Sequence, residues 1–162
     1  MSGFRRGKRL GIDVGKARIG VARSDPDGLL ATPVETVART DESIARILVL
    51  ADEEDAFELL VGLPLSMSGA DTASTADARE FAAALAEASV RSGSDRGVRL
   101  VDERLSTVSA HAALRQSGRS QRSSRSIVDQ IAAVVLLQQA IDFEKSQGRP
   151  PGIAVLVDQE PA

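Results

Sequence analysis

The chain has 162 residues and a net charge of −3, which suits one compact domain with its own core. It has no cysteine, which excludes disulfides, thiolate zinc sites and cysteine nucleophiles, and its only aromatic residues are four phenylalanines, so nucleic-acid binding must rest on charge. No run is long and apolar enough to cross a bilayer, and there is no signal peptide, so we expect a cytoplasmic protein with no membrane partner.

The first elements are two short apolar runs, about 8–14 and 18–24, whose glycine-bearing connection predicts a hairpin. In the first run the apolar residues alternate with polar ones, which places them on one face and Asp13 on the other. A carboxylate inside a core strand is costly unless it binds something, and a metal ion commonly fills that role. The plainer alternative is that Asp13 is a turn or strand-end residue.

The middle of the chain alternates strands and helices. A Pro-Asp-Gly turn leads to a strand over about 30–38, after which the pattern predicts a helix over about 41–53, a strand over 58–63, a loop over 64–72, an alanine-rich helix to about 91 and a strand over 98–101. Ser74 and Asp77 have the spacing of a capping box at the start of the alanine-rich helix.

The last third is predicted to contain a helix over about 107–116, a polar and mobile stretch over 117–126, and a helix over about 127–144. A break at 148–152 follows, and the apolar tail over 153–162 has no predicted place. This order of elements predicts an α/β fold with a mixed sheet, in which an antiparallel start precedes parallel units. Ligands gather at the carboxyl ends of parallel strands, where Asp13 and Glu103 could meet.

Basic residues gather in two places although the net charge is negative. The two clusters are Arg5, Arg6, Lys8 and Arg9, and then Arg115, Arg119, Arg122 and Arg125, the second in a stretch without an acid. Such patches can bind phosphates whatever the net charge, or they can form a solvated tail and loop.

Four segments together resemble the motifs of the YqgF/RuvX family, in the family's order and over nearly the whole chain. They are Gly11–Gly15 with Arg18–Asp25, then Val61–Leu65, Asp102–Thr107 and Asp129–Ala133. The resemblance implies a ribonuclease H-like fold with a five-stranded mixed sheet, a nuclease domain over 1–148 and a tail over 149–162. It also implies a metal-dependent endonuclease acting in 5′-end maturation of pre-16S rRNA.

By the same resemblance, Asp13, Glu103 and Asp129 are the acidic trio that would bind Mg²⁺ or Mn²⁺ and carry a two-metal phosphodiester hydrolysis. Residue pattern alone does not choose between Glu103 and its neighbour Asp102, because a central strand is apolar on both faces. Asp129 could instead complete a capping box begun at Ser126. Its helical neighbours at i+3, i+4 and i+7 are small or apolar, however, which predicts that they pack on the sheet and carry Asp129 inward.

Several polar residues are candidates for contacting a nucleic-acid backbone. They are Lys16, Arg18, Ser66, Ser68, Arg104, Arg119, Arg122 and Arg125. The sequence departs from the family at Ser66 and Ser68, where Asn, Asp or another polar residue is usual, and at Ala17, which replaces a basic residue. Compared with junction resolvases, the last helix supplies one acid, because Ala132 stands at the i+3 position.

Other functions stay open. A junction-resolvase-like DNA nuclease would take branched DNA, and a non-catalytic adaptor would bind RNA or ribosomal precursor particles without cleaving. A phosphotransferase of the actin and sugar-kinase type would need two such domains around a cleft, and this length supplies one. The expected partner is nucleic acid, either structured or precursor rRNA or branched DNA, and the expected state is a monomer or homodimer.

Overall fold

The computed structural model describes residues 3–102 and 121–157, and for 121–127 it describes the backbone alone. In chain order the elements are β1 (Arg9–Val14), β2 (Arg18–Ser24), β3 (Ala31–Ala38), α1 (Ser43–Glu54), β4 (Glu58–Leu63), α2 (Ala73–Arg91), β5 (Gly97–Asp102), α4 (Gln121–Gln147) and β6 (Ile153–Ala154). No helix within these described ranges combines the length and the hydropathy that a membrane span requires.

The strands form one mixed sheet in the order β3-β2-β1-β4-β5-β6. β1, β2 and β3 are antiparallel neighbours, whereas β1, β4 and β5 run parallel. This confirms the predicted antiparallel start followed by parallel units, but the sheet has six strands and not five. The sixth is β6, which pairs antiparallel with β5 through Ile153 and Ala154. Two residues are too few to show a period of two, so the sequence could not reveal this strand.

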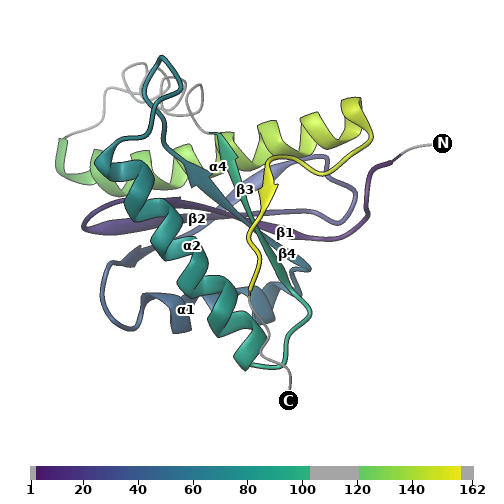
Figure 1. The fold of residues 1–162 in the computed structure, drawn as a ribbon, viewed down its shortest axis with the longest axis horizontal. Helices are drawn as coiled ribbons and strands as arrows, with labels where there is room; N and C mark the ends of the chain where they lie inside the picture. The colour runs from purple at the N-terminus through teal and green to yellow at the C-terminus, as the bar shows by residue number, and fades with distance from the viewer. Residues whose placement is uncertain (1–2, 103–120, 158–162) are drawn as a thin grey trace.

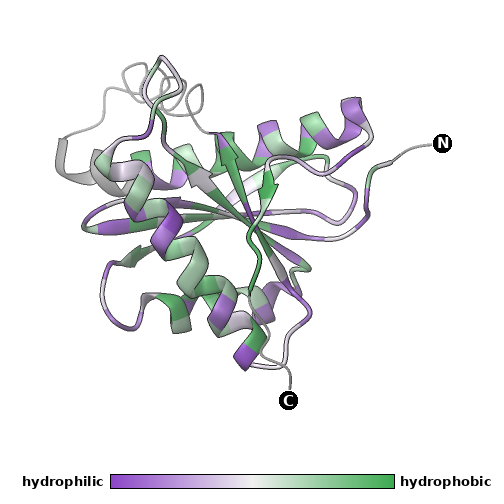
Figure 2. Cartoon of the chain, in the orientation of Figure 1, coloured by the Kyte–Doolittle hydropathy of each residue, from purple (hydrophilic) through white to green (hydrophobic). Residues whose placement is uncertain are grey.

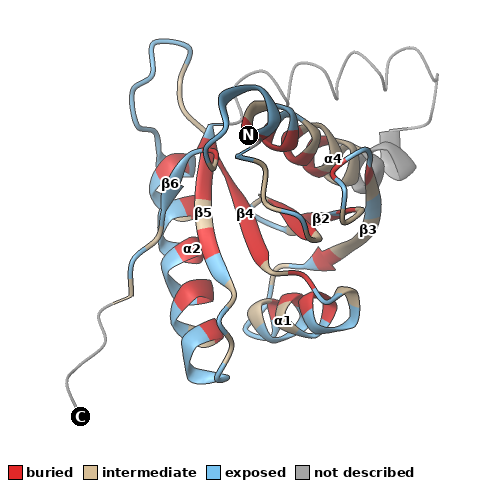
Figure 3. Cartoon of the chain, turned by 90° about the vertical axis from the view of Figure 1, so that its right-hand side faces the viewer, coloured by how far each residue is buried: buried red, intermediate tan, exposed pale blue. Residues whose placement is uncertain are grey.

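Helices cover both faces of the sheet: α4 lies on one side, and α1 and α2 lie on the other (Figure 1). β4 is almost entirely apolar, whereas β2 and β3 carry several polar residues and the outer helix surfaces are polar (Figure 2). One core fills the α1 and α2 side and includes Leu10 and Ile12, so the predicted alternation of β1 is confirmed. A second, smaller core fills the α4 side. β4 is buried along its whole length between the two (Figure 3).

α4 begins earlier than the sequence predicted. Residues 121–126, expected to belong to a mobile polar stretch, are already helical, and the helix extends to Gln147. Asp129 therefore lies within the helix and not in its first turn, which rules out the alternative in which Asp129 completes a capping box with Ser126. Serine has a low helix propensity, so the stretch resembles a loop in sequence, and packing of the following turns against the sheet extends the helix through it.

The start of α2 was also predicted wrongly in one detail. Thr72 and Thr75, and not Ser74 and Asp77, form the capping box: the Thr72 side chain accepts from the Thr75 backbone N–H, and the Thr75 hydroxyl lies 2.9 Å from the Thr72 backbone N–H. The Thr75 hydroxyl also donates to the carbonyl of Pro64. These bonds connect the end of β4 to the start of α2, and they leave Asp77 available for a different partner.

Two residues of the N-terminal basic cluster, Arg5 and Arg9, pair with buried acids, whereas Arg6 is exposed. Arg5 bridges Glu58 and Glu144 at 2.8 Å each, and Arg9 contacts Glu144 at 3.0 Å. The side chains of Arg9 and Glu144 are 1% and 0% exposed. Neither a phosphate-binding patch nor a solvated tail describes these two arginines, because their charge is matched by buried acids from β4 and α4.

Candidate active site

Asp13 lies near the carboxyl end of β1, on the face that α4 covers. Its neighbours in the strand, Ile12 and Val14, point toward the core beneath α1 and α2. Across the hairpin, Asp13 is paired with Gly20 of β2. The next residue on the same face of β1, Gly11, lies directly beneath α4, since a Cβ there would come within 2.8 Å of the Leu137 side chain.

α4 approaches the hairpin closely at Gly20. A Cβ on Gly20 would lie 1.9 Å from the backbone oxygen of Asp129, so only a glycine lets the helix approach this near. The same turn of α4 is held to β3 by Gln130, whose Nε2 donates to Thr36 Oγ1 at 2.8 Å. Because Gly20 is also the cross-strand partner of Asp13, the structure brings Asp13 and Asp129 to one place.

The packing of α4 agrees with the predicted inward face. Ala132, Ala133 and Leu136 are 5%, 0% and 1% exposed, and they face the sheet as their spacing from Asp129 required. Asp129 itself is partly exposed, with 18% of its side chain accessible. The packed face of α4 therefore positions Asp129, while its carboxylate still reaches solvent.

Arg18 has a carboxylate as its partner. Its Nε donates to Asp129 Oδ2 at 2.8 Å, and the Arg18 side chain is 37% exposed. The sequence predicted this arginine as a phosphate contact, and the ion pair neither requires nor excludes that role. Lys16, the other basic residue of the hairpin turn, is exposed.

Arg39 was missed by the sequence analysis. From the end of β3, its Nη1 donates to the carbonyl of Gly15 at 2.8 Å, and both terminal nitrogens bind the carboxylate of Asp77 in α2. The hydrogen bonds from Arg39 lower the pKa of Asp77, and the charge of Lys16 acts in the same direction. Arg39 thus connects the β1–β2 turn to α2, and no local pattern marks a pair 38 residues apart.

The predicted Ser66 and Ser68 lie in the loop between β4 and α2. Ser66 closes a tight turn, since its carbonyl accepts from Gly69 at 2.8 Å and its N–H donates to Ala70 at 3.0 Å. The hydroxyls of Ser66 and Ser68 are 2.9 Å apart. At the tip, Met67 is 82% exposed. The loop follows the carboxyl end of β4, the strand beside β1, and its hydroxyls face solvent.

The remaining predicted residues fall outside what the structure describes. Glu103, Arg104 and Arg119 lie between the described ranges, and Arg122 and Arg125 belong to the part of α4 described by its backbone. Asp102 is exposed at the end of β5 and is paired in register with Leu63. Among the side chains that are described, no group of three Asp, Glu, His or Cys could hold a metal ion. Two of the three predicted acids, Asp13 and Asp129, are nevertheless in adjacent positions.

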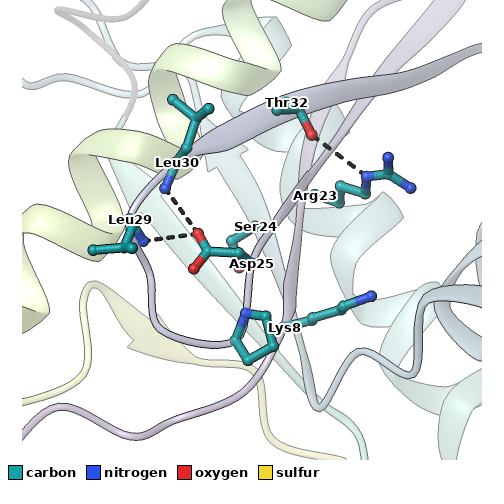
Figure 4. Close-up of a pocket in the computed structure, with 8 residues that line it drawn as sticks. Lys8, Arg23, Ser24, Asp25, Leu29, Leu30 and Thr32 are labelled. Carbon is teal, nitrogen blue, oxygen red and sulfur yellow. Dashed lines mark hydrogen bonds between the residues drawn. The ribbon is translucent and has the colours of Figure 1, made fainter.

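A separate hollow of about 570 Å³ lies at the opposite end of β1 (Figure 4). Its charged residues already have partners: Lys8 and Arg23 both pair with Glu54, and Asp25 accepts from the backbone N–H groups of Leu29 and Leu30. These backbone bonds lower the pKa of Asp25. The hollow contains none of the predicted site residues, and its shape follows from the packing of the β2–β3 turn.

Comparison with known proteins adds a family match and relatives that span the chain. The family model described as RuvX, Holliday junction resolvase, matches residues 7–143. A relative named "Putative pre-16S rRNA nuclease" from Clavibacter michiganensis subsp. michiganensis is 56% identical over 155 residues, covering 94% of this chain and 93% of that protein. A relative of the same name from Streptomyces coelicolor is 49% identical over 156 residues, covering 95% and 91%.

Solved structures show the same fold at low identity. The T. thermophilus RuvC in complex with Holliday junction substrate has a TM-score of 0.56 at 13% identity, covering 90% of this chain and 99% of that one. The yeast mitochondrial Holliday junction resolvase Ydc2 has a TM-score of 0.55 at 10% identity, covering 90% and 81%. The ribonuclease H-like fold implied by the sequence motifs is confirmed.

Proposed function

The chain belongs to the RuvX family, and we propose that it is a metal-dependent endonuclease that hydrolyses nucleic-acid phosphodiester bonds in 5′-end maturation of pre-16S rRNA. The observation that carries this proposal is the contact at Gly20. One glycine is both the cross-strand partner of Asp13 and the packing partner of Asp129. Two acids from distant parts of the sequence are thereby held together at the carboxyl end of β1.

The donor chemistry suits Mg²⁺ or Mn²⁺. Carboxylate oxygens are hard ligands that these ions prefer, and a site without cysteine or histidine needs no other kind. Asp13, Glu103 and Asp129 would hold the metal. When bound, such ions activate a water molecule for attack and stabilise charge on the leaving oxygen.

The place of Glu103 in this proposal is supported by β5. Leu100 belongs to the core under α1 and α2, whereas Val101 belongs to the core under α4. Alternation then assigns Asp102 to the side of Leu100, and if it continues, Glu103 to the side of Val101. That is the side on which Asp13 and Asp129 meet, so the strand pattern favours Glu103 over Asp102 as the third ligand.

The substrate would be bound by basic and hydroxyl groups around the acids. We assign this role to Lys16, Arg18, Ser66, Ser68, Arg104, Arg119, Arg122 and Arg125. We further propose that residues 1–148 make up the nuclease domain, with 149–162 as its tail. In this proposal the protein acts in the cytoplasm, as a monomer or homodimer, on precursor rRNA or on ribosomal precursor particles.

The test is a cleavage assay with Mg²⁺ or Mn²⁺ on two substrates, a precursor RNA spanning the 5′ end of 16S rRNA and a four-way DNA junction. Wild-type protein should cleave the RNA, and Asp13→Asn should not, although its fold is retained because neutralising one of several clustered acids relieves repulsion. Asp27→Asn, at a surface carboxylate that is 60% exposed, is the matched control and should cleave normally.

Three results would contradict the proposal or redirect it. Full activity of Asp13→Asn, or full activity in excess EDTA, would overturn the metal-dependent mechanism. Cleavage of the junction but not of the RNA would reassign the substrate to branched DNA. Tight RNA binding without any cleavage would leave a non-catalytic adaptor.

A further inference from the structure

The ion pair between Arg18 and Asp129 lies within the proposed metal site. Arg18 Nε is 2.8 Å from Asp129 Oδ2, and the two side chains are 37% and 18% exposed. This partly sheltered guanidinium therefore neutralises a carboxylate that the proposed function assigns to a divalent cation. The positive charge of Arg18, held at Asp129 Oδ2, repels a divalent cation that binds the same carboxylate, so the two compete for Asp129.

We propose that Arg18 has two alternative partners: it holds Asp129 in the metal-free protein, and it turns to a substrate phosphate when a divalent cation takes Asp129. This inference rests on the proposed function and adds a regulation of that same site. It makes Arg18 a built-in competitor of the metal and couples metal binding to substrate binding.

The backbone around the pair is fixed, so only one side chain has to move. The carbonyl of Arg18 accepts from the N–H of Gly15 at 2.9 Å, and Arg18 is in register with Ala38 of β3. On the other side, Asp129 rests on Gly20 and its neighbour Gln130 is bonded to β3. The exposed third of the Arg18 side chain gives it a route toward solvent, where a phosphate would arrive.

The second nearby arginine provides a contrast. Arg39 binds both oxygens of Asp77 and a backbone carbonyl as well, which is the arrangement of a fixed structural bridge. Arg18 meets Asp129 through Nε and one oxygen. A guanidinium also matches the geometry of a phosphate, so exchange from carboxylate to phosphate retains a charge-assisted hydrogen bond.

The direct test is Mn²⁺ binding to the full chain without nucleic acid, measured by electron paramagnetic resonance of free Mn²⁺. Arg18→Met should bind Mn²⁺ roughly three- to tenfold more tightly than wild type, because a competing positive charge has been removed. Arg18→Lys, which keeps the charge, should stay within about twofold of wild type. Arg46→Met, which removes an exposed ion pair with Glu35, is the matched control and should have no effect.

A second measurement tests the exchange. Binding of the precursor RNA is titrated with salt in EDTA and in Ca²⁺, an ion we use to occupy the site without supporting cleavage. Arg18→Met should reduce the log–log salt slope by roughly one unit in Ca²⁺ and leave it unchanged in EDTA, where Arg18 is held by Asp129.

The outcomes separate this inference from the function on which it rests. If wild-type protein binds Mn²⁺ and Asp13→Asn loses it, but Arg18→Met has unchanged or weaker Mn²⁺ affinity, the pair is a structural bridge and this inference alone is overturned. An equal loss of salt slope in EDTA and in Ca²⁺ would also overturn it. If no variant and no wild-type protein binds Mn²⁺, the proposed metal-dependent function is overturned together with this inference.

Discussion

Replacing Gly20 with alanine tests whether the contact between β2 and α4 places Asp129. The added Cβ would lie 1.9 Å from the Asp129 backbone oxygen, whereas ordinary contacts of this kind begin at about 3.5 Å. The obstacle is helix backbone and not a flexible side chain, so α4 must move away by about 1.6 Å or the hairpin must bend by as much. The φ of Gly20 is not left-handed, so alanine is otherwise compatible with the strand.

Two quantities follow from that displacement. Overpacking of this size costs about 1–3 kcal/mol of the free energy of unfolding, which for a domain of this length lowers the melting temperature by roughly 2–12 °C. Misplacing a catalytic group by about 1 Å costs on the order of 100-fold in rate. We therefore expect Gly20→Ala to remain folded at 25 °C and to lose most of its cleavage activity.

The assay combines thermal unfolding with single-turnover cleavage of the precursor RNA. Gly97→Ala is the matched control: it also lies in the sheet, but no atom lies within 4 Å of where its Cβ would be. It should keep wild-type activity, with stability unchanged or slightly raised. If Gly20→Ala were as active and as stable as Gly97→Ala, the close approach would not place Asp129 and the reasoning would be refuted.

Three further predictions concern the other acids and the basic stretch. Glu144→Gln should cost about 3–5 kcal/mol in urea unfolding at pH 7, because it leaves buried Arg9 without its carboxylate. Burial alone would raise the pKa of Glu144, but the hydrogen bonds from Arg5 and the charges of Arg9 and Arg5 together outweigh it and keep the pKa low. This stabilisation is therefore complete at pH values above the unfolded-state pKa of about 4.3, and it is lost as the pH falls through the lower folded-state pKa. The variant should therefore lose less stability than wild type on acidification. An identical dependence on pH would refute this reasoning. Glu103→Gln should slow cleavage far more than Asp102→Asn, and the reverse result would shift the third ligand by one residue. Joint replacement of Arg119, Arg122 and Arg125 should weaken RNA binding at low salt and reduce the log–log salt slope by about one unit per lost contact. An unchanged slope would show that the stretch is only a linker.

The sequence alone determined the features that depend on neighbours along the chain. Alternation in the first strand placed Asp13 opposite the apolar residues of the main core, and the helical spacing after Asp129 identified the face that packs on the sheet. The four motifs identified the family and, with it, the ribonuclease H-like fold. These features are periods of two and of 3.6 residues, which side-chain type reveals directly.

Only the tertiary structure decided which distant groups meet. It joined Arg5 and Arg9 to Glu144, more than 130 residues away, and so bound two arginines of the N-terminal basic cluster to a buried acid. It paired Arg18 with Asp129 and Arg39 with Asp77, and it added β6 to the sheet. None of these contacts has a local signature, because an ion pair depends on where two elements cross and not on the residues beside either partner.

Gly20 shows the difference most clearly. In the sequence it is one glycine of a hairpin, and its neighbours predict only a strand. In the fold, the absence of a Cβ at Gly20 lets the α4 backbone contact β2 directly, next to Asp13. The sequence supplied the two acids, and the packing of a helix on a sheet decided that they share a site, because close approach is a property of two surfaces together.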